Sequence, residues 1–148
     1  ADYVGEIVKS FQETSRKDFI VNYDQNSNSL NITKSTEIIY GLRNFIGNAN
    51  KFSENKIFIN IKSDSDLTEI IIEDDGEGYQ KDILSKIGEP YIKSVKSSIK
   101  SKSGLGLGIF IGKTLLEKNY ANILCRNSKT RGGAEVSIKW KNEDLLKL

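Results

Sequence analysis

The sequence predicts a domain of the α+β class, in which helices and strands occupy separate segments around one core. The chain has 148 residues, of which 37% are hydrophobic, and this is enough for one packed core. Apolar residues recur at helical spacing in several segments, and β-prone runs occur in pairs between them and after them. No internal repeat divides the chain. We therefore predict a single domain over residues 1–148.

The first third of the chain predicts a helix, a hairpin and a second helix. Apolar residues at helical spacing indicate a short amphipathic helix over 3–14. Short β-prone runs at 19–23 and 30–33 flank a polar, turn-rich stretch, which predicts a hairpin. The second helix begins after Ser35, whose hydroxyl can cap it, and runs to about Phe52.

The rest of the chain predicts two strands, a loop, a helix and two more strands. The β-prone runs 57–61 and 69–73 are joined by a polar turn. The Ser/Lys-rich stretch 88–103 contains the only proline and little apolar periodicity, which predicts a mobile loop. The remaining elements are an apolar helix and two strands, over 105–117, 121–126 and 134–140.

Composition and charge exclude several classes of function. With 22 Lys and Arg against 20 Asp and Glu, the net charge of +2 is too small for a surface built to bind nucleic acid. The sequence has no run of about 20 apolar residues and no signal peptide, so we expect a soluble, intracellular chain. The single cysteine, Cys125, is expected to be a small core residue, not a reactive thiol. Because the chain has no histidine, no imidazole of its own can act as base, metal ligand or phosphoacceptor.

The predicted helix over 35–52 has two chemically different faces. At about 100° per residue, its polar face carries Asn44, Asn48 and Lys51. An amide oxygen is a hard ligand for Mg²⁺, and a lysine supplies charge for phosphate. A solvated polar face is the alternative, and it is the more common case for one amphipathic helix taken alone. The apolar face consists of Ile38, Leu42, Phe45, Ile46 and Ala49.

A segment with two acids and two glycines, 74–78, follows a predicted strand directly. A carboxylate at a strand end lies where ligand crevices often form, and it can accept a hydrogen bond from an exocyclic amine. Gly76 and Gly78 would allow a flat base to approach the backbone closely. A plain Asp/Gly turn is the alternative.

A third segment, 103–108, leads from the predicted loop into the apolar helix. Backbone N–H groups at a helix N-terminus bind anions, and Gly104 and Gly106 would let phosphate oxygens approach them. Gly112-Lys113-Thr114 ends like a P-loop, but Leu107 stands where that motif needs glycine, so we reject this interpretation. The lysine-rich loop before the segment could close over phosphates, remain a solvated loop, or contact nucleic acid weakly.

The order of these segments resembles the ATP-binding catalytic domain of sensor histidine kinases, within the gyrase, Hsp90, histidine kinase and MutL superfamily. Residues 44–53 are similar to the N box of that family, and 74–78 and 104–107 to its two glycine boxes. Glu89-Pro90-Tyr91 is similar to the F box between them. The stretches 88–91 and 106–117, and the Gly-Ala pair before the final strand, most resemble the redox-responsive RegB/PrrB type.

The resemblance implies the Bergerat fold, a two-layer α/β sandwich. In it, a mixed, mostly antiparallel sheet packs against helices, and a mobile lid over about 79–103 covers the nucleotide. It implies that Asn48 binds Mg²⁺, that Lys51 contacts phosphate, and that Asp74 reads the adenine amine in place of its neighbour Asp75. The ATP-binding set implied by the resemblance is Asn44, Asn48, Lys51, Phe52, Asp74, Gly76, Gly78, Tyr91, Ser103, Gly104, Leu105, Gly106 and Leu107.

The function implied is phosphoryl transfer. Hydrolytic members of the superfamily activate water with a glutamate at the position of Asn44, and an amide cannot act as a general base at neutral pH. We therefore expect transfer to a histidine on a separate dimerisation domain, and then to a response-regulator aspartate. The chain would be the cytoplasmic catalytic part of a homodimeric bacterial sensor kinase, anchored in the inner membrane by regions outside this sequence.

Three alternatives to this function stay open: an ATPase of the same fold, a serine-directed kinase, and an interaction module without nucleotide. The sequence also departs from the family pattern in two places. Lys102 stands near a position that is often glycine, and Gly47 stands where related kinases frequently carry an acid.

Overall fold

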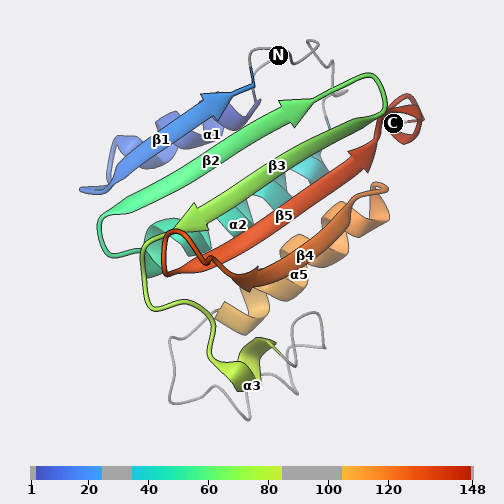
Figure 1. The fold of residues 1–148 in the computed structure, drawn as a ribbon. Coiled ribbons are helices and arrows are strands. Elements are labelled where there is room, and N and C mark those ends of the chain that lie inside the picture. Colours follow the sequence, from blue (N-terminus) through green and yellow to red (C-terminus); the bar gives the residue numbers. More distant parts are fainter. Residues whose placement is uncertain (1–2, 25–34, 85–104, 148) are drawn as a thin grey trace.

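The computed structural model describes residues 3–24, 35–84 and 105–147. In these residues the chain forms two layers, a five-stranded sheet and a layer of helices on one of its faces (Figure 1). The strand order is β1-β2-β3-β5-β4, with β1 and β2 parallel and every other pair antiparallel. The predicted α/β sandwich with a mixed, mostly antiparallel sheet is therefore confirmed. The strands are β1 Asp18–Tyr23, β2 Lys56–Ser63, β3 Leu67–Asp74, β4 Asn122–Asn127 and β5 Ala134–Lys141.

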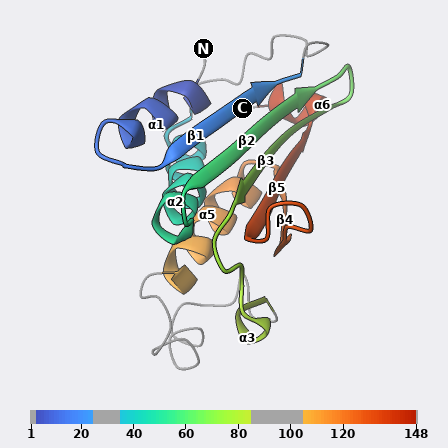
Figure 2. The ribbon, with the colours of Figure 1, turned by 60° about the vertical axis from the view of Figure 1, so that its left-hand side comes forward.

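Three helices form the second layer, and Figure 2 shows α1, α2 and α5 together on the same side of the sheet. All three lie close to their predicted positions. Two short helices, α3 and α6, were not predicted, because four residues carry too little periodicity to indicate a helix. None of the helices in the described part of the chain is long and apolar enough to cross a membrane. The helices are α1 Tyr3–Gln12, α2 Thr36–Phe52, α3 Lys81–Leu84, α5 Leu105–Lys118 and α6 Asn142–Leu145.

The edge strand β1 has a partner that the sequence did not indicate. Its predicted hairpin partner, 30–33, lies outside the described residues. Within them, β1 pairs in parallel with β2, so that Phe19 stands opposite Ile57 and Val21 opposite Ile59. The predicted loop over 88–103 also lies outside the described residues.

Helix α2 forms as its sequence predicts. Ser35 is the N-cap, and its hydroxyl accepts a hydrogen bond from the backbone N–H of Ile38 at 3.4 Å. The five apolar residues predicted to face the core are all buried. At the other end, the Lys17 ammonium donates to the carbonyls of Asn50 and Ser53, and a cation is favourable at a helix C-terminus.

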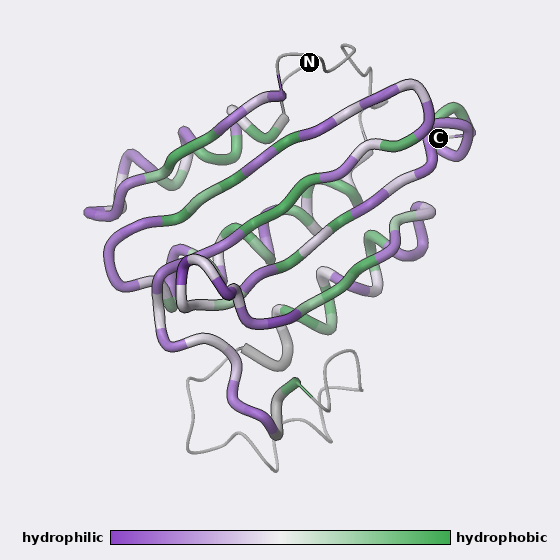
Figure 3. The backbone as a smooth tube through the Cα atoms, in the orientation of Figure 1, coloured by the Kyte–Doolittle hydropathy of each residue, from purple (hydrophilic) through white to green (hydrophobic). Residues whose placement is uncertain are grey.

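The core lies between the sheet and the helices. Figure 3 shows hydrophobic residues concentrated in the middle of the strands and along α5, with hydrophilic residues at the turns. Strand residues that alternate along β2, β3 and β5 are buried against the helix layer. They are Ile57, Ile59, Ile70, Ile72, Val136, Ile138 and Trp140.

Helices α2 and α5 pack closely because glycines lie at their contact. A Cβ on Gly41 would stand 2.6 Å from Leu116, and a Cβ on Gly112 would stand 2.7 Å from the Phe45 ring. Both distances are shorter than any normal carbon contact, so a side chain there would push the helices apart. Gly112 therefore serves helix packing, in agreement with our rejection of the P-loop interpretation. The same packing brings Gly108 of α5 against Asn48 of α2.

Candidate functional site

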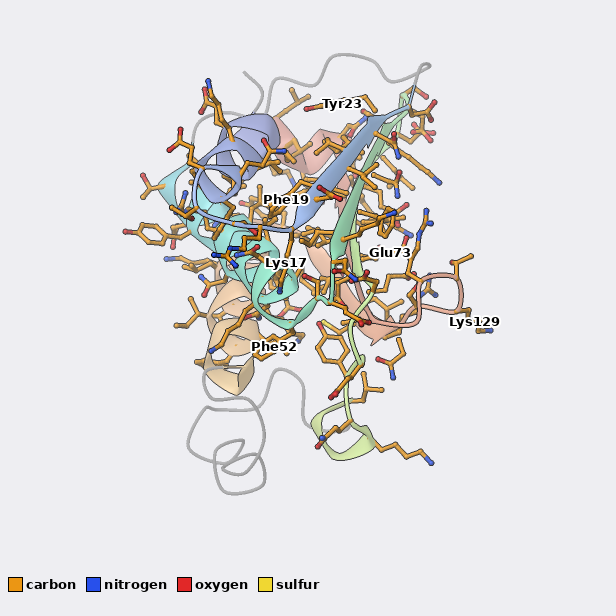
Figure 4. All side chains as sticks on the ribbon, turned by 90° about the vertical axis from the view of Figure 1, so that its left-hand side faces the viewer. Lys17, Phe19, Tyr23, Phe52, Glu73 and Lys129 are labelled. Carbon is orange, nitrogen blue, oxygen red and sulfur yellow. The ribbon has the colours of Figure 1, made fainter. Side chains whose placement is uncertain are left out.

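A pocket opens between the C-terminal half of α2 and the neighbouring ends of β3 and β5. Its wall is mostly apolar, with one amide and one carboxylate set into it, which is the usual make-up of a small-molecule site. Figure 4 shows Phe52, one of the lining residues, at the end of α2, on the opposite side of the sheet from Lys129. The lining residues are Phe45, Asn48, Ala49, Phe52, Ile72, Asp74, Gly78, Tyr79, Ala134 and Val136.

The carboxylate in the pocket belongs to Asp74, the last residue of β3, which is 4% exposed. Its Oδ1 atom accepts hydrogen bonds from the backbone N–H of Gly76 at 2.9 Å and of Ala134 at 3.2 Å. These bonds hold the carboxylate in one orientation. An ionised carboxylate only accepts hydrogen bonds, so its place in the wall suits a ligand that presents N–H groups.

The carboxylate of the neighbouring acid, Asp75, faces the turn after α2 and not the pocket. Its carboxylate accepts hydrogen bonds from the backbone N–H groups of Glu54, Asn55 and Lys56, at 2.9 to 3.2 Å. Burial acts to raise the pKa of the Asp75 carboxyl, but these hydrogen bonds outweigh it and lower the pKa. Asp75 therefore joins the end of β3 to the turn after α2 and does not line the pocket.

Two glycines let the backbone approach this carboxylate and the end of α2. A Cβ on Gly76 would stand 2.1 Å from the carbonyl oxygen of Phe52. A Cβ on Gly133 would stand 2.1 Å from Asp74 Oδ1. No side chain fits at either distance, so both positions need glycine. The sequence indicated Gly76 through its motif, but it marked Gly133 only as part of the Gly-Ala pair and did not indicate its contact with Asp74 across the β3–β5 pairing.

The amide in the pocket belongs to Asn48, which is half-buried and lies next to α5. A Cβ on Gly108 would stand 2.9 Å from Asn48 Oδ1, so the glycine leaves room for the amide. The Asn48 Nδ2 atom is buried and has no hydrogen-bond partner among the residues that the structure describes. A buried donor without a partner costs about 1–3 kcal/mol. The Asn48 Nδ2 atom can therefore donate to a group that lies outside the described residues.

The other two polar residues of α2 lie outside the pocket wall. Asn44 is one helical turn before Asn48, and its Nδ2 atom donates to the carbonyl oxygen of Tyr40 at 2.8 Å. Lys51 is exposed, and its Nζ atom lies 5.3 Å from the centroid of the Phe52 ring. Lys51 is thus next to a lining residue at the rim, where it can reach a charged part of a ligand.

Residues 33–144 match the family described as "Histidine kinase-, DNA gyrase B-, and HSP90-like ATPase". The chain belongs to this ATPase family. The match contains the pocket and every lining residue named above. It confirms the family resemblance that the N box and the glycine boxes predicted.

Curated relatives of this ATPase domain are sensor histidine kinases. The chain is 35% identical over 131 residues to the sensor histidine kinase RegB of Cereibacter sphaeroides, with 78% of this chain and 28% of RegB covered. It is 33% identical over 89 residues to the sensor histidine kinase CssS of Bacillus subtilis, with 60% of this chain and 18% of CssS covered. The predicted similarity to the RegB type is confirmed, and the chain spans less than a third of either relative.

Solved structures similar to this ATPase domain have the same fold. The mycobacterial sensor histidine kinase MprB superposes with a TM-score of 0.75 at 20% identity, covering 95% of this chain and 93% of that one. The catalytic domain of histidine kinase ThkA gives a TM-score of 0.75 at 19% identity, covering 97% and 93%. These likenesses support the two-layer fold described above.

The second glycine box of the ATPase domain is only partly described. Leu105, Gly106 and Leu107 form the start of α5, in agreement with the predicted helix, and only their backbone is described. Tyr91, Ser103 and Gly104 lie outside the described residues.

Several lining residues were not predicted to line the site. Tyr79, the first residue of the predicted lid, is buried in the pocket wall, and its burial raises the pKa of its phenol. Ala134 and Val136 come from β5, more than 50 residues further along the chain. Phe45 and Ala49 were predicted only as core residues. They line the pocket because the core and the pocket share one face of α2.

Cys125 packs behind this wall. Burial raises the pKa of the thiol to about 11, although a hydrogen bond with Tyr79 acts to lower it. Such a thiol is almost fully protonated at neutral pH, and the thiolate is the reactive form. Cys125 is thus a packing residue, as its sequence context predicted.

Proposed function

We propose that this chain binds ATP with Mg²⁺ and donates the γ-phosphoryl group to a histidine on the dimerisation domain of a sensor kinase. The phosphoryl group would then pass to an aspartate of a response regulator. The observation that carries the proposal is the pair of polar groups in one apolar pocket, the Asp74 carboxylate and the Asn48 amide, whose Nδ2 donor has no partner among the described residues. The carboxylate suits a ligand with N–H groups at one end. At the other end, the Asn48 Nδ2 atom could donate to a phosphate or a water, and its oxygen could bind a hydrated cation.

The base would bind at the Asp74 end. The carboxylate would accept from the exocyclic amine of adenine, and the rings of Phe52 and Tyr79 would flank the base plane. Gly76 and Gly78 would form this end of the site through their close contacts with the Phe52 carbonyl and the Asn127 side chain, which leave no space for the base on those sides of the two glycines.

The phosphates would bind toward α5 and the rim. The Asn48 oxygen suits Mg²⁺, which when bound would neutralise charge on the phosphates. Lys51 and the backbone N–H groups of Gly104 and Gly106 would contact the phosphate oxygens. Asn44 lies nearby on the same helix. The other members of this set would be Tyr91, Ser103, Leu105 and Leu107.

Transfer to a histidine is favoured over hydrolysis by the amide at Asn44. An amide does not take a proton from water at neutral pH, so this helix offers no general base one turn before Asn48. The Asn44 amide already donates to the Tyr40 carbonyl, which supports a structural role. The sequence contains no histidine, so the phosphoacceptor would belong to another domain.

The other proposed partners follow from this role. The dimerisation domain would bring two copies of the kinase together, and a sensor region outside this sequence would anchor it in the bacterial inner membrane. This domain would then lie in the cytoplasm. No direct contact with nucleic acid is proposed, because the net charge is only +2.

The test is to mix the chain with a histidine-bearing dimerisation domain and ATP labelled on the γ-phosphate. The native chain should label the histidine, while Asn48→Asp and Asp74→Asn should lower the labelling at least tenfold. Asn122→Ala changes an exposed asparagine on β4 and serves as the control. An unlabelled histidine with an intact acceptor domain would refute the kinase function.

Three other outcomes would favour the alternatives. Rapid phosphate release by the chain alone would favour an ATPase, and labelling of an added serine substrate would favour a serine-directed kinase. No binding of ATP with Mg²⁺ in calorimetry would favour an interaction module.

A further inference from the structure

The side chain of Asn127, the last residue of β4, pairs with the backbone of Tyr79 in the way that two strands pair in a sheet. Its Oδ1 atom accepts a hydrogen bond from the backbone N–H of Tyr79 at 2.6 Å. Its Nδ2 atom donates to the carbonyl oxygen of Tyr79 at 3.0 Å. One side chain thus satisfies both backbone polar groups of a residue that lines the pocket.

The same side chain also packs against Gly78. Gly78 has a φ of 80°, and a Cβ at this position would stand 2.7 Å from Asn127 Oδ1. Glycine adopts positive φ without steric cost, but for the same reason it does not hold this conformation by itself. The contact with Asn127 therefore restricts the backbone conformation at Gly78, which glycine alone would leave free.

A third wall residue is tied to Asn127 through the sheet. The backbone of Asn127 stands opposite Ala134 in the β4–β5 register. Asn127 therefore joins Gly78, Tyr79 and Ala134, which all line the pocket, although it does not line the pocket itself. Ala134 in turn donates its N–H to Asp74 Oδ1 at 3.2 Å. The wall around the Asp74 carboxylate is thus connected through one asparagine.

We propose that Asn127 is a positioning residue for the base of the bound nucleotide. It holds Gly78 and Tyr79 in the geometry that the base requires, so that binding does not have to order them. This inference rests on the proposed binding of ATP. It assigns a role to a residue of the C-terminal hairpin, far along the chain from Asp74 and Asn48.

A positioning role for Asn127 predicts that its loss weakens the contacts to the base and leaves the contribution of Mg²⁺ to the affinity unchanged. Asn127 touches the wall at the Asp74 end, and none of its described hydrogen bonds reaches Asn48 or Lys51. Loss of its side chain should weaken every adenine nucleotide by a similar factor. The gain in affinity that Mg²⁺ provides should stay the same, because distant and independent contributions are additive.

The test compares Asn127→Ala with Asn122→Ala, an exposed asparagine on the same strand. Calorimetry would give the Kd of ADP and of ATP, each with and without Mg²⁺, and thermal unfolding would confirm that both variants are folded. Asn127→Ala should raise all four Kd values by a similar factor, on the order of tenfold, because binding would then have to order Gly78 and Tyr79. The ratio of the Kd values with and without Mg²⁺ should match the native ratio, and Asn122→Ala should behave as the native chain.

A second variant covers the case in which Asn127→Ala does not fold. Asn127→Asp keeps the acceptor for the Tyr79 N–H but sets a carboxylate oxygen against the Tyr79 carbonyl oxygen, so its affinity for all adenine nucleotides should be weaker than native. Native affinity in the aspartate variant, or a loss seen only with Mg²⁺, would overturn the positioning role while the native chain still binds ATP. A native chain that binds no nucleotide would overturn the proposed function as well.

Discussion

Removing the Asp75 carboxylate should destabilise the domain and open the pocket at its α2 end. Three backbone N–H groups, those of Glu54, Asn55 and Lys56, donate to this carboxylate. In Asp75→Ala these N–H groups would donate to water instead, and the end of β3 would no longer be joined to the turn after α2. Similar losses at helix N-caps cost about 0.5–2 kcal/mol. With three donors to a charged acceptor, we expect the free energy of unfolding to fall by about 2 kcal/mol.

The pH dependence of this effect follows from the lowered pKa of Asp75. A carboxyl whose pKa is lower in the folded state stabilises the fold fully above its unfolded pKa, which is near 3.8 for an aspartate. This stabilisation disappears as the pH falls through the folded pKa. The difference in unfolding free energy between the native chain and Asp75→Ala should therefore be largest at pH 7. It should shrink below about pH 4.

Asp64 offers a matched comparison at the other end of the same β2–β3 hairpin. Its Oδ1 atom accepts from the backbone N–H of Asp66 at 2.8 Å and of Leu67 at 2.7 Å, and these bonds also lower its pKa. Urea unfolding should show that Asp64→Ala and Asp75→Ala both lose stability. Calorimetry at pH 7 should show weaker ATP binding only for Asp75→Ala. Equal loss of ATP affinity in both variants, or a stability loss that is the same at pH 7 and pH 3, would refute this reasoning.

Three further predictions concern the pocket and the core. Asp74→Asn keeps the Oδ1 acceptor but replaces the other oxygen with a donor. ATP should therefore bind at least tenfold more weakly, while GTP binding stays unchanged. Equal losses of ATP and GTP affinity in calorimetry would argue against a role of Asp74 in recognising adenine. Gly133→Ala should cost about 1–3 kcal/mol in urea unfolding because its Cβ would meet Asp74, whereas Gly47→Ala, with only an ordinary contact to Phe11, should be neutral or stabilising. Cys125, with a pKa of about 11, should react with a thiol reagent at pH 8 on the order of a hundredfold more slowly than a free cysteine, and a comparable rate would contradict its burial.

Much of the fold follows from signals that lie within a few residues of one another. The capping of α2 by Ser35 depends on the N–H of Ile38, three residues away. The buried face of this helix depends on side chains that recur every three or four residues. The strands β2 and β3 were similarly indicated by short β-prone runs, 57–61 and 69–73. These features were predictable because neighbouring residues in the sequence determine them.

Part of the site was predictable for the same reason. Asp74 and Gly76 belong to one short motif, and the structure adds that Asp74 lines the pocket while Asp75 holds the turn after α2. The two glycines of the motif marked close backbone contacts, but the sequence did not indicate what they contact. Gly76 meets the carbonyl oxygen of Phe52, and Gly78 meets the side chain of Asn127.

The amino-acid sequence was enough to predict the class of the fold and the family, and it pointed to Asn48 and Asp74, which both line the pocket. Contacts across the sheet, which the sequence did not indicate, make β1 parallel to β2, pack Gly133 on Asp74 and hold the Tyr79 segment against Asn127. These contacts join residues tens of positions apart, and their formation depends on how whole strands align across the sheet. The local pattern of the sequence does not indicate how the strands align, because the free energy that favours the alignment comes from many side chains that are buried together in the core.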